Sequence, residues 1–88
     1  MRGHVVITGA SSGIGHSLAR KLATRGWQVS AIARRYEKLT ELQKQTGSIL
    51  PLSADVSVPE QIETALKKAE NASGPVDMAI LNAGIYTP

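Results

Sequence analysis

The pattern of apolar and polar positions alternates between short strand-like runs and longer helical stripes. Residues 4–8 hold a β-branched run, residues 27–33 (WQVSAIA) alternate, and residues 76–83 (VDMAILNA) are almost continuously apolar. These patterns predict three strands, the last of the kind that is buried on both faces of a parallel sheet. Residues 48–53 predict a weaker strand, because Pro51 lacks a backbone donor and belongs at a sheet edge.

Apolar residues recur at helical spacing between the predicted strands. The first stripe starts near Gly13 and stops at Gly26, which offers a left-handed C-terminal cap. A second helix is predicted over residues 35–45, with Gly47 as its stop. The apolar members of the first stripe are Ile14, Leu18, Ala19, Leu22 and Ala23.

The third predicted helix opens with a capping signal. Ser57 and Glu60 have the spacing of a capping box, in which the serine hydroxyl caps the helix, and Pro59 stands in the first turn. The Gly-Pro pair at 74–75 ends the helix. The apolar positions that recur between these ends are Ile62, Leu66 and Ala69.

The order of elements, βαβαβαβ, predicts an α/β fold with a parallel sheet. Right-handed crossovers and short connections favour the strand order 3-2-1-4, part of a Rossmann-like doubly wound sheet. The order then reverses between the first and fourth strands, directly above the turn that follows the first strand. Open α/β sheets bind ligands at such a point. We find no internal linker or repeat and treat residues 1–88 as one segment of a single domain.

Composition fits this fold and removes several alternatives. The 88 residues are 42% hydrophobic but include only three aromatic residues, so we expect an aliphatic core. The absence of cysteine excludes disulfides and thiolate metal sites, and two isolated histidines give no metal-ligand pattern. No apolar run reaches the length of a signal-peptide core or a membrane span, so we expect a cytoplasmic protein without a membrane partner.

The whole chain has a net charge of +3, and its positive charge is concentrated in the first half. Residues 1–45 hold eight Lys and Arg against two Glu, whereas residues 46–88 hold two Lys against five acidic residues. A basic half is one sign of a nucleic-acid surface. However, interleaved aromatics are missing, and several cations fall in the last turns of predicted helices, where they favour the dipole. We therefore expect no nucleic-acid partner.

The stretch TGASSGIG lies where the first strand turns into the first helix. Gly9, Gly13 and Gly15 remove side chains where the backbone turns, where a ligand can approach and where the helix packs on the strand. A helix starting there aims its unpaired N–H groups and positive dipole end at the turn, which makes an anion site that fits a pyrophosphate. A tightly packed turn has the same needs, so both interpretations stay open. A P-loop is excluded, because no lysine follows at the required spacing.

The second predicted strand ends in arginines instead of an acidic residue. An Asp or Glu about 20 residues after the glycines would bind the ribose 2′-hydroxyl of NAD. Here the strand ends with Ala33, Arg34 and Arg35. The guanidiniums of the two arginines stand where a 2′-phosphate would lie. Each charge-assisted bond contributes roughly 1.5–3 kcal/mol, so one or two favour NADP over NAD by about one to three orders of magnitude. The alternative is that both arginines are merely solvated residues at a helix start.

Three motifs together resemble the short-chain dehydrogenase/reductase family. The coenzyme motif TGxxxGxG is present at residues 8–15, and an acidic-apolar pair is present at Asp55 and Val56. The NNAG motif matches residues 81–84, except that Leu81 replaces its first Asn. The resemblance covers nearly the whole chain. It implies the N-terminal NAD(P)-binding segment of a longer single-domain oxidoreductase.

The resemblance also implies a role for each matching residue. Asp55 could alternatively be a helix-entry residue, and Asn82 could bond the loop to the sheet, and either residue could serve both purposes. In the family, the phosphates are lined by residues that match Gly9, Ser11, Gly13, Ile14 and Gly15, the 2′-phosphate by Arg34 and Arg35, adenine by Asp55 and Val56, and the ribose by Asn82, Ala83 and Gly84, and we count the adjoining Ser12 and Ala33 among the coenzyme-binding residues.

The family's catalytic residues are not found in these 88 residues. Its reaction uses a Ser, and a Tyr and Lys spaced as YxxxK, all after the NNAG motif. Tyr36 is followed at the fourth position by Thr40, and Tyr86 lies beside the last residues, so neither is that tyrosine. We therefore expect no turnover by this chain alone. For the longer protein we expect NADP(H)-dependent interconversion of an alcohol and a carbonyl.

Two further expectations concern what the chain binds. A non-catalytic dinucleotide-binding or protein-interaction module is the alternative to an enzyme. The fourth predicted strand is apolar, and no later element within these residues covers it. An open apolar edge of this kind pairs readily with another chain, so we expect a homo-oligomer formed through it.

Overall fold

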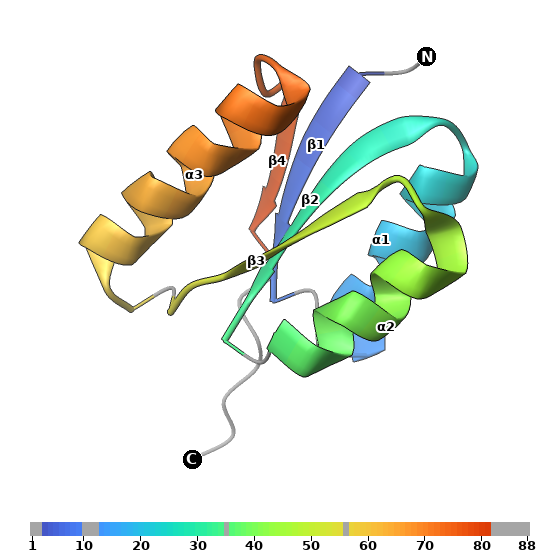
Figure 1. Cartoon of the computed structure of the whole chain (residues 1–88), viewed down its shortest axis with the longest axis horizontal. Helices are drawn as coiled ribbons and strands as arrows, with labels where there is room; N and C mark the ends of the chain where they lie inside the picture. Colours follow the sequence, from blue (N-terminus) through green and yellow to red (C-terminus); the bar gives the residue numbers. More distant parts are fainter. Residues whose placement is uncertain (1–2, 10–12, 35, 56, 82–88) are drawn as a thin grey trace.

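The chain forms one parallel four-stranded sheet with helices on both faces (Figure 1). The computed structural model describes residues 3–9, 13–34, 36–55 and 57–81. The strands are β1 (Gly3–Thr8), β2 (Trp27–Ala33), β3 (Ile49–Ser53) and β4 (Met78–Leu81), in the order β3-β2-β1-β4. The helices are α1 (Gly13–Thr24), α2 (Tyr36–Thr46) and α3 (Pro59–Ser73). The α/β class, the partial Rossmann-like architecture and the strand order 3-2-1-4 are therefore confirmed.

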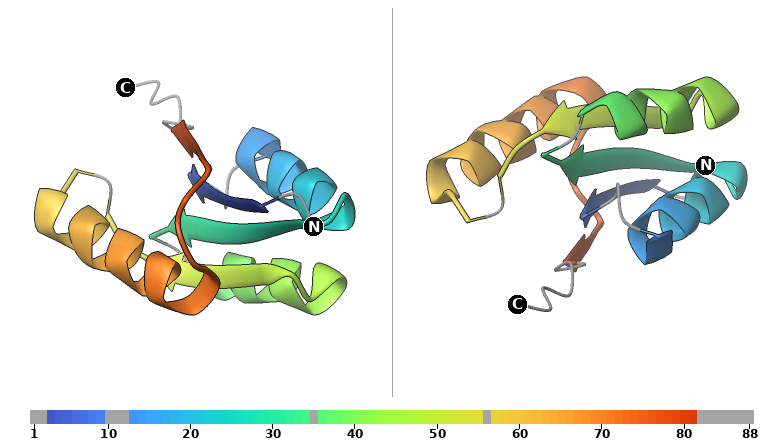
Figure 2. Two further views of the ribbon diagram at one scale, coloured as in Figure 1. Left: turned by 90° about the horizontal axis from the view of Figure 1, so that it is seen from above. Right: turned by 90° about the horizontal axis from the view of Figure 1, so that it is seen from below.

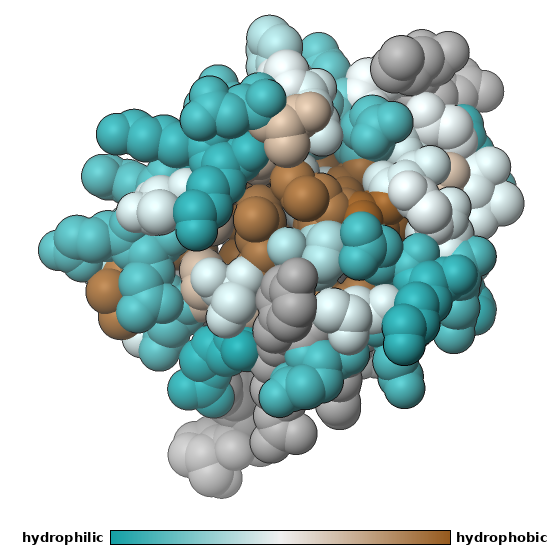
Figure 3. Space-filling view, viewed as in Figure 1, coloured by the Kyte–Doolittle hydropathy of each residue, from teal (hydrophilic) through white to brown (hydrophobic). Residues whose placement is uncertain are grey.

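The two faces of the sheet carry separate apolar clusters. Helices α1 and α2 cover one face and α3 covers the other, as both views in Figure 2 show. Val5 and Ile7 of β1 pack toward α1 and α2, whereas Val6 joins the cluster under α3. Figure 3 shows hydrophilic residues over α3 and a hydrophobic centre where β3 runs between the helices. The core is aliphatic, as the composition predicts.

Element boundaries agree with the sequence pattern to within a few residues. Strand β2 begins and ends where its alternation predicts. Helix α2 lies one residue later than residues 35–45, and β3 lacks the first of residues 48–53. Pro51 lies in β3, which is an edge strand as expected.

Helix α1 meets the sheet through its smallest residues. Ala19 is fully buried and Ala23 nearly so, and Gly15 is buried on the same stripe. Because these small residues make the contact with the sheet, the larger residues beside them point away from it. Leu18 is only partly buried, and Ile14, in the first turn, is 73% exposed. Ile14 thus belongs to the apolar stripe of the sequence but not to the buried face of α1.

Helix α3 starts differently from the predicted capping box. Its N-cap is Val58, without a side-chain cap, and Pro59 follows in the first turn. The Ser57 hydroxyl donates instead to Asp55 Oδ1 at 2.7 Å, so the predicted box does not form. Ser57 lies outside the helix, two residues from Asp55, whose carboxylate accepts the hydrogen bond of its hydroxyl. The C-terminal stop is confirmed, because Gly74 adopts a φ of 84°.

Strand β4 is shorter and more exposed than the sequence predicts. Residues 76 and 77 precede it, and residues 82–83 lie outside the described part of the chain. Met78 is 37% and Leu81 78% exposed. Burial on both faces is therefore not observed in this chain. The reason is that α1, α2 and α3 lie over β1, β2 and β3, and no described helix packs extensively on β4.

Polar groups tie the amino end of the sheet together. The His4 ring is 2% exposed, and its Nδ1 lies 2.9 Å from the Gly74 carbonyl oxygen. Its Nε2 lies 2.6 Å from Ser30 Oγ. The His4 backbone N–H donates to Asp77 Oδ2 at 2.8 Å. His4 therefore connects β1 to β2 and to the turn between α3 and β4.

Candidate functional site

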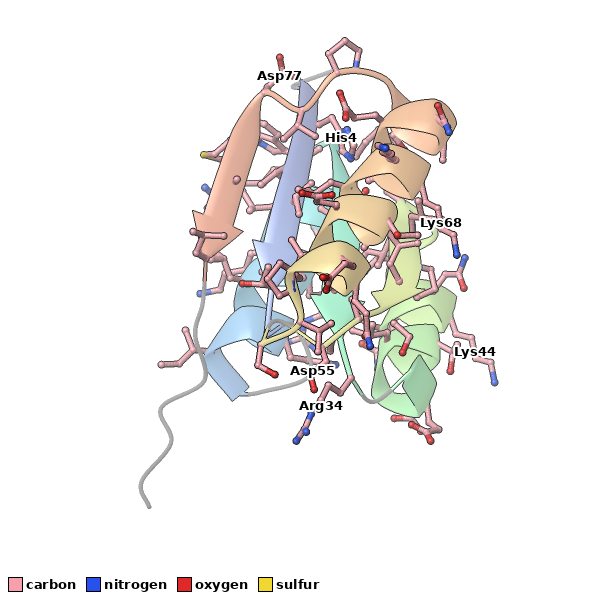
Figure 4. All side chains as sticks on the ribbon, turned by 90° about the vertical axis from the view of Figure 1, so that its left-hand side faces the viewer. His4, Arg34, Lys44, Asp55, Lys68 and Asp77 are labelled. Carbon is pink, nitrogen blue, oxygen red and sulfur yellow. The ribbon has the colours of Figure 1, made fainter. Side chains whose placement is uncertain are left out.

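The predicted ligand site lies at the carboxyl ends of the strands. Gly9 follows β1, Arg34 follows β2 and Asp55 follows β3. Figure 4 shows Arg34 and Asp55 near one another at this end, while His4 and Asp77 lie at the opposite end of the sheet. The strand order places β1 between β2 and β4, so the glycine turn is central at this end.

Gly9 and Gly13, which flank residues 10–12, lie between the end of β1 and the start of α1. Gly9 has a φ of +66°, which lets the chain leave β1 at once. A Cβ built on Gly13 would meet no atom of another described element within 4 Å, so packing among the described residues does not itself exclude a side chain there. The first turn of α1 carries no acidic residue, so nothing in that turn competes with an anion for its N–H groups.

Arg34 and Asp55 form a loose ion pair beside the turn. Arg34 Nη1 lies 4.0 Å from Asp55 Oδ2, with side-chain exposures of 69% and 31%. An exposed pair at this distance adds little to stability. The guanidinium thus keeps most of its donors available to a ligand, and the described end of β2 carries no carboxylate of its own.

The Asp55 carboxylate is fixed by its own loop. The hydroxyl and then the backbone N–H of Ser57 lower the pKa of Asp55 below its ordinary value; burial opposes this, and the Arg34 guanidinium contributes least, in the lowering direction. The Ser57 N–H donates to Asp55 Oδ1 at 2.9 Å. The carboxylate is therefore held ionised as an acceptor at this position.

Further hydrogen bonds join the ends of β2 and β3. The Asp55 N–H donates to Gln61 Oε1 at 2.8 Å, which ties the loop to α3. The Ser53 hydroxyl donates to the Arg34 carbonyl at 3.3 Å, and the Ala54 N–H donates to the Ala33 carbonyl at 3.1 Å. Sequence reasoning missed these contacts. No local spacing in the sequence marks them, since Gln61 lies six residues after Asp55 and Ser53 nineteen after Arg34.

The structure places half of the predicted site residues and brings them to one end of the sheet. Ala33 is buried under this end, and Ile14 stands exposed in the first turn of α1. The other predicted residues lie outside the described part of the chain: Ser11, Ser12, Arg35, Val56, Asn82, Ala83 and Gly84.

Two further kinds of site were searched for within residues 3–9, 13–34, 36–55 and 57–81. These residues contain no group of three or more His, Cys, Asp or Glu side chains arranged to hold a metal ion. None of the helices among them has the length and apolar character needed to cross a membrane.

The sequence profile described as short chain dehydrogenase matches residues 3–88. A 3-dehydrosphinganine reductase of Arabidopsis thaliana is 43% identical over an alignment 88 positions long, which covers 94% of this chain and 25% of that protein. An NADPH-dependent 1-acyldihydroxyacetone phosphate reductase of Saccharomyces cerevisiae is 42% identical, with 90% of this chain and 28% of that protein covered. The chain thus spans about a quarter of the length of these curated relatives.

Solved structures show the same fold. A short-chain type dehydrogenase/reductase from Mycobacterium marinum superposes with a TM-score of 0.90 at 34% identity, over 98% of this chain and 36% of that one. An actinorhodin polyketide ketoreductase variant solved with NADPH gives a TM-score of 0.88 at 32% identity, over 94% of this chain and 33% of that one.

Proposed function

The chain belongs to the short chain dehydrogenase family, and on that premise we propose that it forms the NADP(H)-binding part of a carbonyl-reducing oxidoreductase. Members of this family bind a nicotinamide dinucleotide and act on small molecules. Several relatives are named reductases or oxidoreductases. The whole protein interconverts an alcohol and a carbonyl, and this segment supplies the coenzyme site.

The exposed Arg34 at the end of β2 carries the proposal for NADP(H) over NAD(H). A guanidinium at this place can form charge-assisted hydrogen bonds with a 2′-phosphate, whereas a carboxylate would repel it. Arg34 is 69% exposed and only loosely paired with Asp55, so it can turn to a ligand without breaking a strong contact. The relative from Saccharomyces cerevisiae is itself named as NADPH-dependent, which supports the same preference.

Each remaining part of the site has a binding task. The N–H groups at the start of α1 hold the pyrophosphate, with Gly13 leaving space for its approach. Asp55 accepts a hydrogen bond from adenine, because Ser57 keeps its carboxylate ionised and oriented. Arg35, Val56 and residues 82–84 complete the contacts by their match to the family motifs. The bound coenzyme supplies the hydride.

The names of the relatives suggest the class of substrate. A reductase of 3-dehydrosphinganine and a reductase of 1-acyldihydroxyacetone phosphate both act on molecules with a long apolar part. We extend this to the whole protein as a ketone on a lipid-like substrate. The residues that would choose the substrate and carry out acid-base catalysis are expected outside these 88 residues, since no YxxxK arrangement is among them.

The experiment compares coenzyme binding with turnover. Isothermal titration of the chain should show NADPH binding about ten- to a thousandfold tighter than NADH. Equal affinities would refute the NADP(H) assignment. A longer form of the protein should oxidise NADPH with a ketone, whereas the 88-residue chain should not. Binding without turnover by the longer form would favour a non-catalytic dinucleotide-binding module instead.

A further inference from the structure

The turn after β3 engages every polar atom of Asp55 except one carboxylate oxygen. The Asp55 carbonyl accepts the Val58 N–H at 3.0 Å, and Oδ1 accepts both the hydroxyl and the backbone N–H of Ser57. The Asp55 N–H donates to Gln61 Oε1 at 2.8 Å. Among the described residues, Oδ2 has only the loose contact with Arg34 at 4.0 Å (Figure 4). Oδ2 is therefore the atom of Asp55 that is open to a ligand.

Gln61 holds Asp55 from outside this turn. Helix α3 begins at Pro59, so Gln61 is its third residue. A Gln at this position ordinarily turns back to the N–H of the N-cap residue, which here is Val58. The Val58 N–H already donates to the Asp55 carbonyl. The Gln61 side chain therefore reaches past the cap of its own helix and accepts the Asp55 N–H.

The contact from Gln61 places the backbone of Asp55 relative to the helix. The buried Ala65 and Ala69 anchor α3 on the sheet, and the Gln61 N–H donates to the Val58 carbonyl at 3.0 Å in the first turn. The Ser57 contacts, in contrast, fix the carboxylate only relative to its own turn. Gln61 is exposed, so its hydrogen bond makes a modest contribution to stability. Its main effect is therefore on where Oδ2 lies.

We propose that Gln61 is a positioning residue for recognition of the adenine amino group, which it serves by holding Asp55 Oδ2 where that group binds. The inference rests on the proposed function, in which Asp55 accepts a hydrogen bond from adenine. In a dinucleotide the 6-amino group carries the only N–H donors of adenine, because N9 bears the ribose. A hydrogen bond to a carboxylate weakens steeply with poor distance and angle. A small shift of the Asp55 backbone thus reduces the preference for a base with an amino group.

Two coenzymes isolate this contact from the rest of the site. NADPH and its purine analogue carry the same charge and differ only in that a hydrogen atom replaces the adenine 6-amino group. Isothermal titration gives the dissociation constant of each. We expect the unaltered protein to bind NADPH roughly tenfold more tightly than the analogue, as one charge-assisted hydrogen bond at an exposed site would give. The ratio of the two constants measures recognition of the amino group, and general effects on coenzyme binding cancel in it.

Two variants of similar shape test the part played by Gln61. Gln61→Met keeps the length of the side chain but removes the acceptor, and it should reduce the ratio at least about threefold. Gln61→Glu keeps an acceptor oxygen and should preserve the ratio, because its added charge acts on both coenzymes alike. The control is Gln43→Met, which makes the same chemical change at an exposed position of α2 and should leave the ratio unchanged. Gln61→Ala removes the same acceptor and takes the place of Gln61→Met if that variant does not fold.

The outcomes separate this inference from the proposed function. If the unaltered protein binds neither coenzyme, both fail. If it binds the two coenzymes equally, Asp55 does not recognise the amino group, and the inference fails while NADP(H) binding stands. An unchanged ratio in folded Gln61→Met, or an equal loss in Gln61→Glu, refutes only the positioning by Gln61.

Hydrogen exchange of the Asp55 amide tests the underlying contact without any coenzyme. The exchange should be slower in the unaltered protein and in Gln61→Glu than in Gln61→Met, because only the first two keep an acceptor for this N–H. Equal rates in all three proteins would mean that the bond does not hold the turn in solution, and would overturn the inference.

Discussion

The Nε2 atom of His4 lies 2.6 Å from the hydroxyl oxygen of Ser30, and both side chains are buried. The carbonyl of Gly74 can only accept, so His4 Nδ1 carries the hydrogen of the contact at 2.9 Å. In the neutral ring, Nε2 is then the acceptor of the Ser30 hydroxyl. Within the described residues, no buried side-chain nitrogen or oxygen lacks a hydrogen-bond partner, and these contacts satisfy the imidazole.

Replacing Ser30 by Ala should destabilise the fold. The substitution leaves His4 Nε2 buried without a donor, which costs about 1–3 kcal/mol. Urea unfolding of the two proteins measures the difference in the free energy of unfolding. Ser53→Ala is the control, because Ser53 is exposed and makes a longer bond of 3.3 Å, and it should change this free energy much less. Equal losses would mean that the contact with His4 has no special weight.

Gly3→Ala should be destabilising by roughly 1–3 kcal/mol. Gly3 has a φ of +128°, a conformation that L side chains rarely adopt. A Cβ there would also approach Asp77 Oδ2 to 2.6 Å, displacing the carboxylate that accepts the His4 N–H. Thermal unfolding should show a lowered Tm, and an unchanged Tm would refute this account of the amino end of the sheet.

Gly13→Ala should separate binding from stability. A Cβ at this position meets no atom of another element within 4 Å in the described part of the chain, and the residue lies in a helix, so the free energy of unfolding should stay within about 1 kcal/mol of the original. Titration with NADPH should nevertheless show weaker binding, because the added methyl group occupies space proposed for the pyrophosphate. Undiminished affinity in a folded variant would argue that Gly13 has no contact with the coenzyme.

Arg34→Asp should reverse the coenzyme preference. The new carboxylate repels a 2′-phosphate and can accept a hydrogen bond from a 2′-hydroxyl, so NADPH affinity should fall by about one to three orders of magnitude while NADH affinity rises. Lys44→Asp makes the same change of net charge in the last turn of α2. Isothermal titration of both variants distinguishes a local contact from a general electrostatic effect, which would lower NADPH affinity equally in the two.

Ser57→Ala should raise the pKa of Asp55 toward its ordinary value of 3.8, because the hydroxyl bond is the main cause of the lowered pKa. A carboxyl whose pKa is lower in the folded state stabilises the protein above its unfolded pKa, and this contribution is lost as the pH falls through the folded pKa. The variant should therefore show less dependence of stability on pH below 3.8. Carboxyl carbon NMR titration checks the pKa directly, and identical titration curves would contradict the assignment.

The fold and the outline of the site could be predicted because they depend on local periodicity and on topological rules. The alternation at residues 27–33 fixes β2, and right-handed crossovers fix the order that brings Arg34 and Asp55 to the same end of the sheet. These features need no knowledge of side-chain packing.

What could not be predicted depends on contacts between distant residues. The bonds of His4 to Ser30 and Gly74 join positions far apart in sequence, and no local pattern marks them. Ile14 fits the apolar period as well as Leu18, but the contact with the sheet is made by the neighbouring row of small residues. The Ser57 hydroxyl had two possible partners, the backbone at the start of α3 and the carboxylate of Asp55. It bonds to the carboxylate, which lies two residues away in the sequence instead of three.

The row of small residues on α1 has a consequence for how sequence variation can spread through this chain. Gly15, Ala19 and Ala23 act as a spacer that sets the height of α1 above the sheet. A larger side chain in the middle of that row would lift the helix and carry its first-turn N–H groups away from Gly9. We therefore expect larger side chains at the buried Ala19 and Ala23 to alter binding at the proposed coenzyme site as well as the packing of α1.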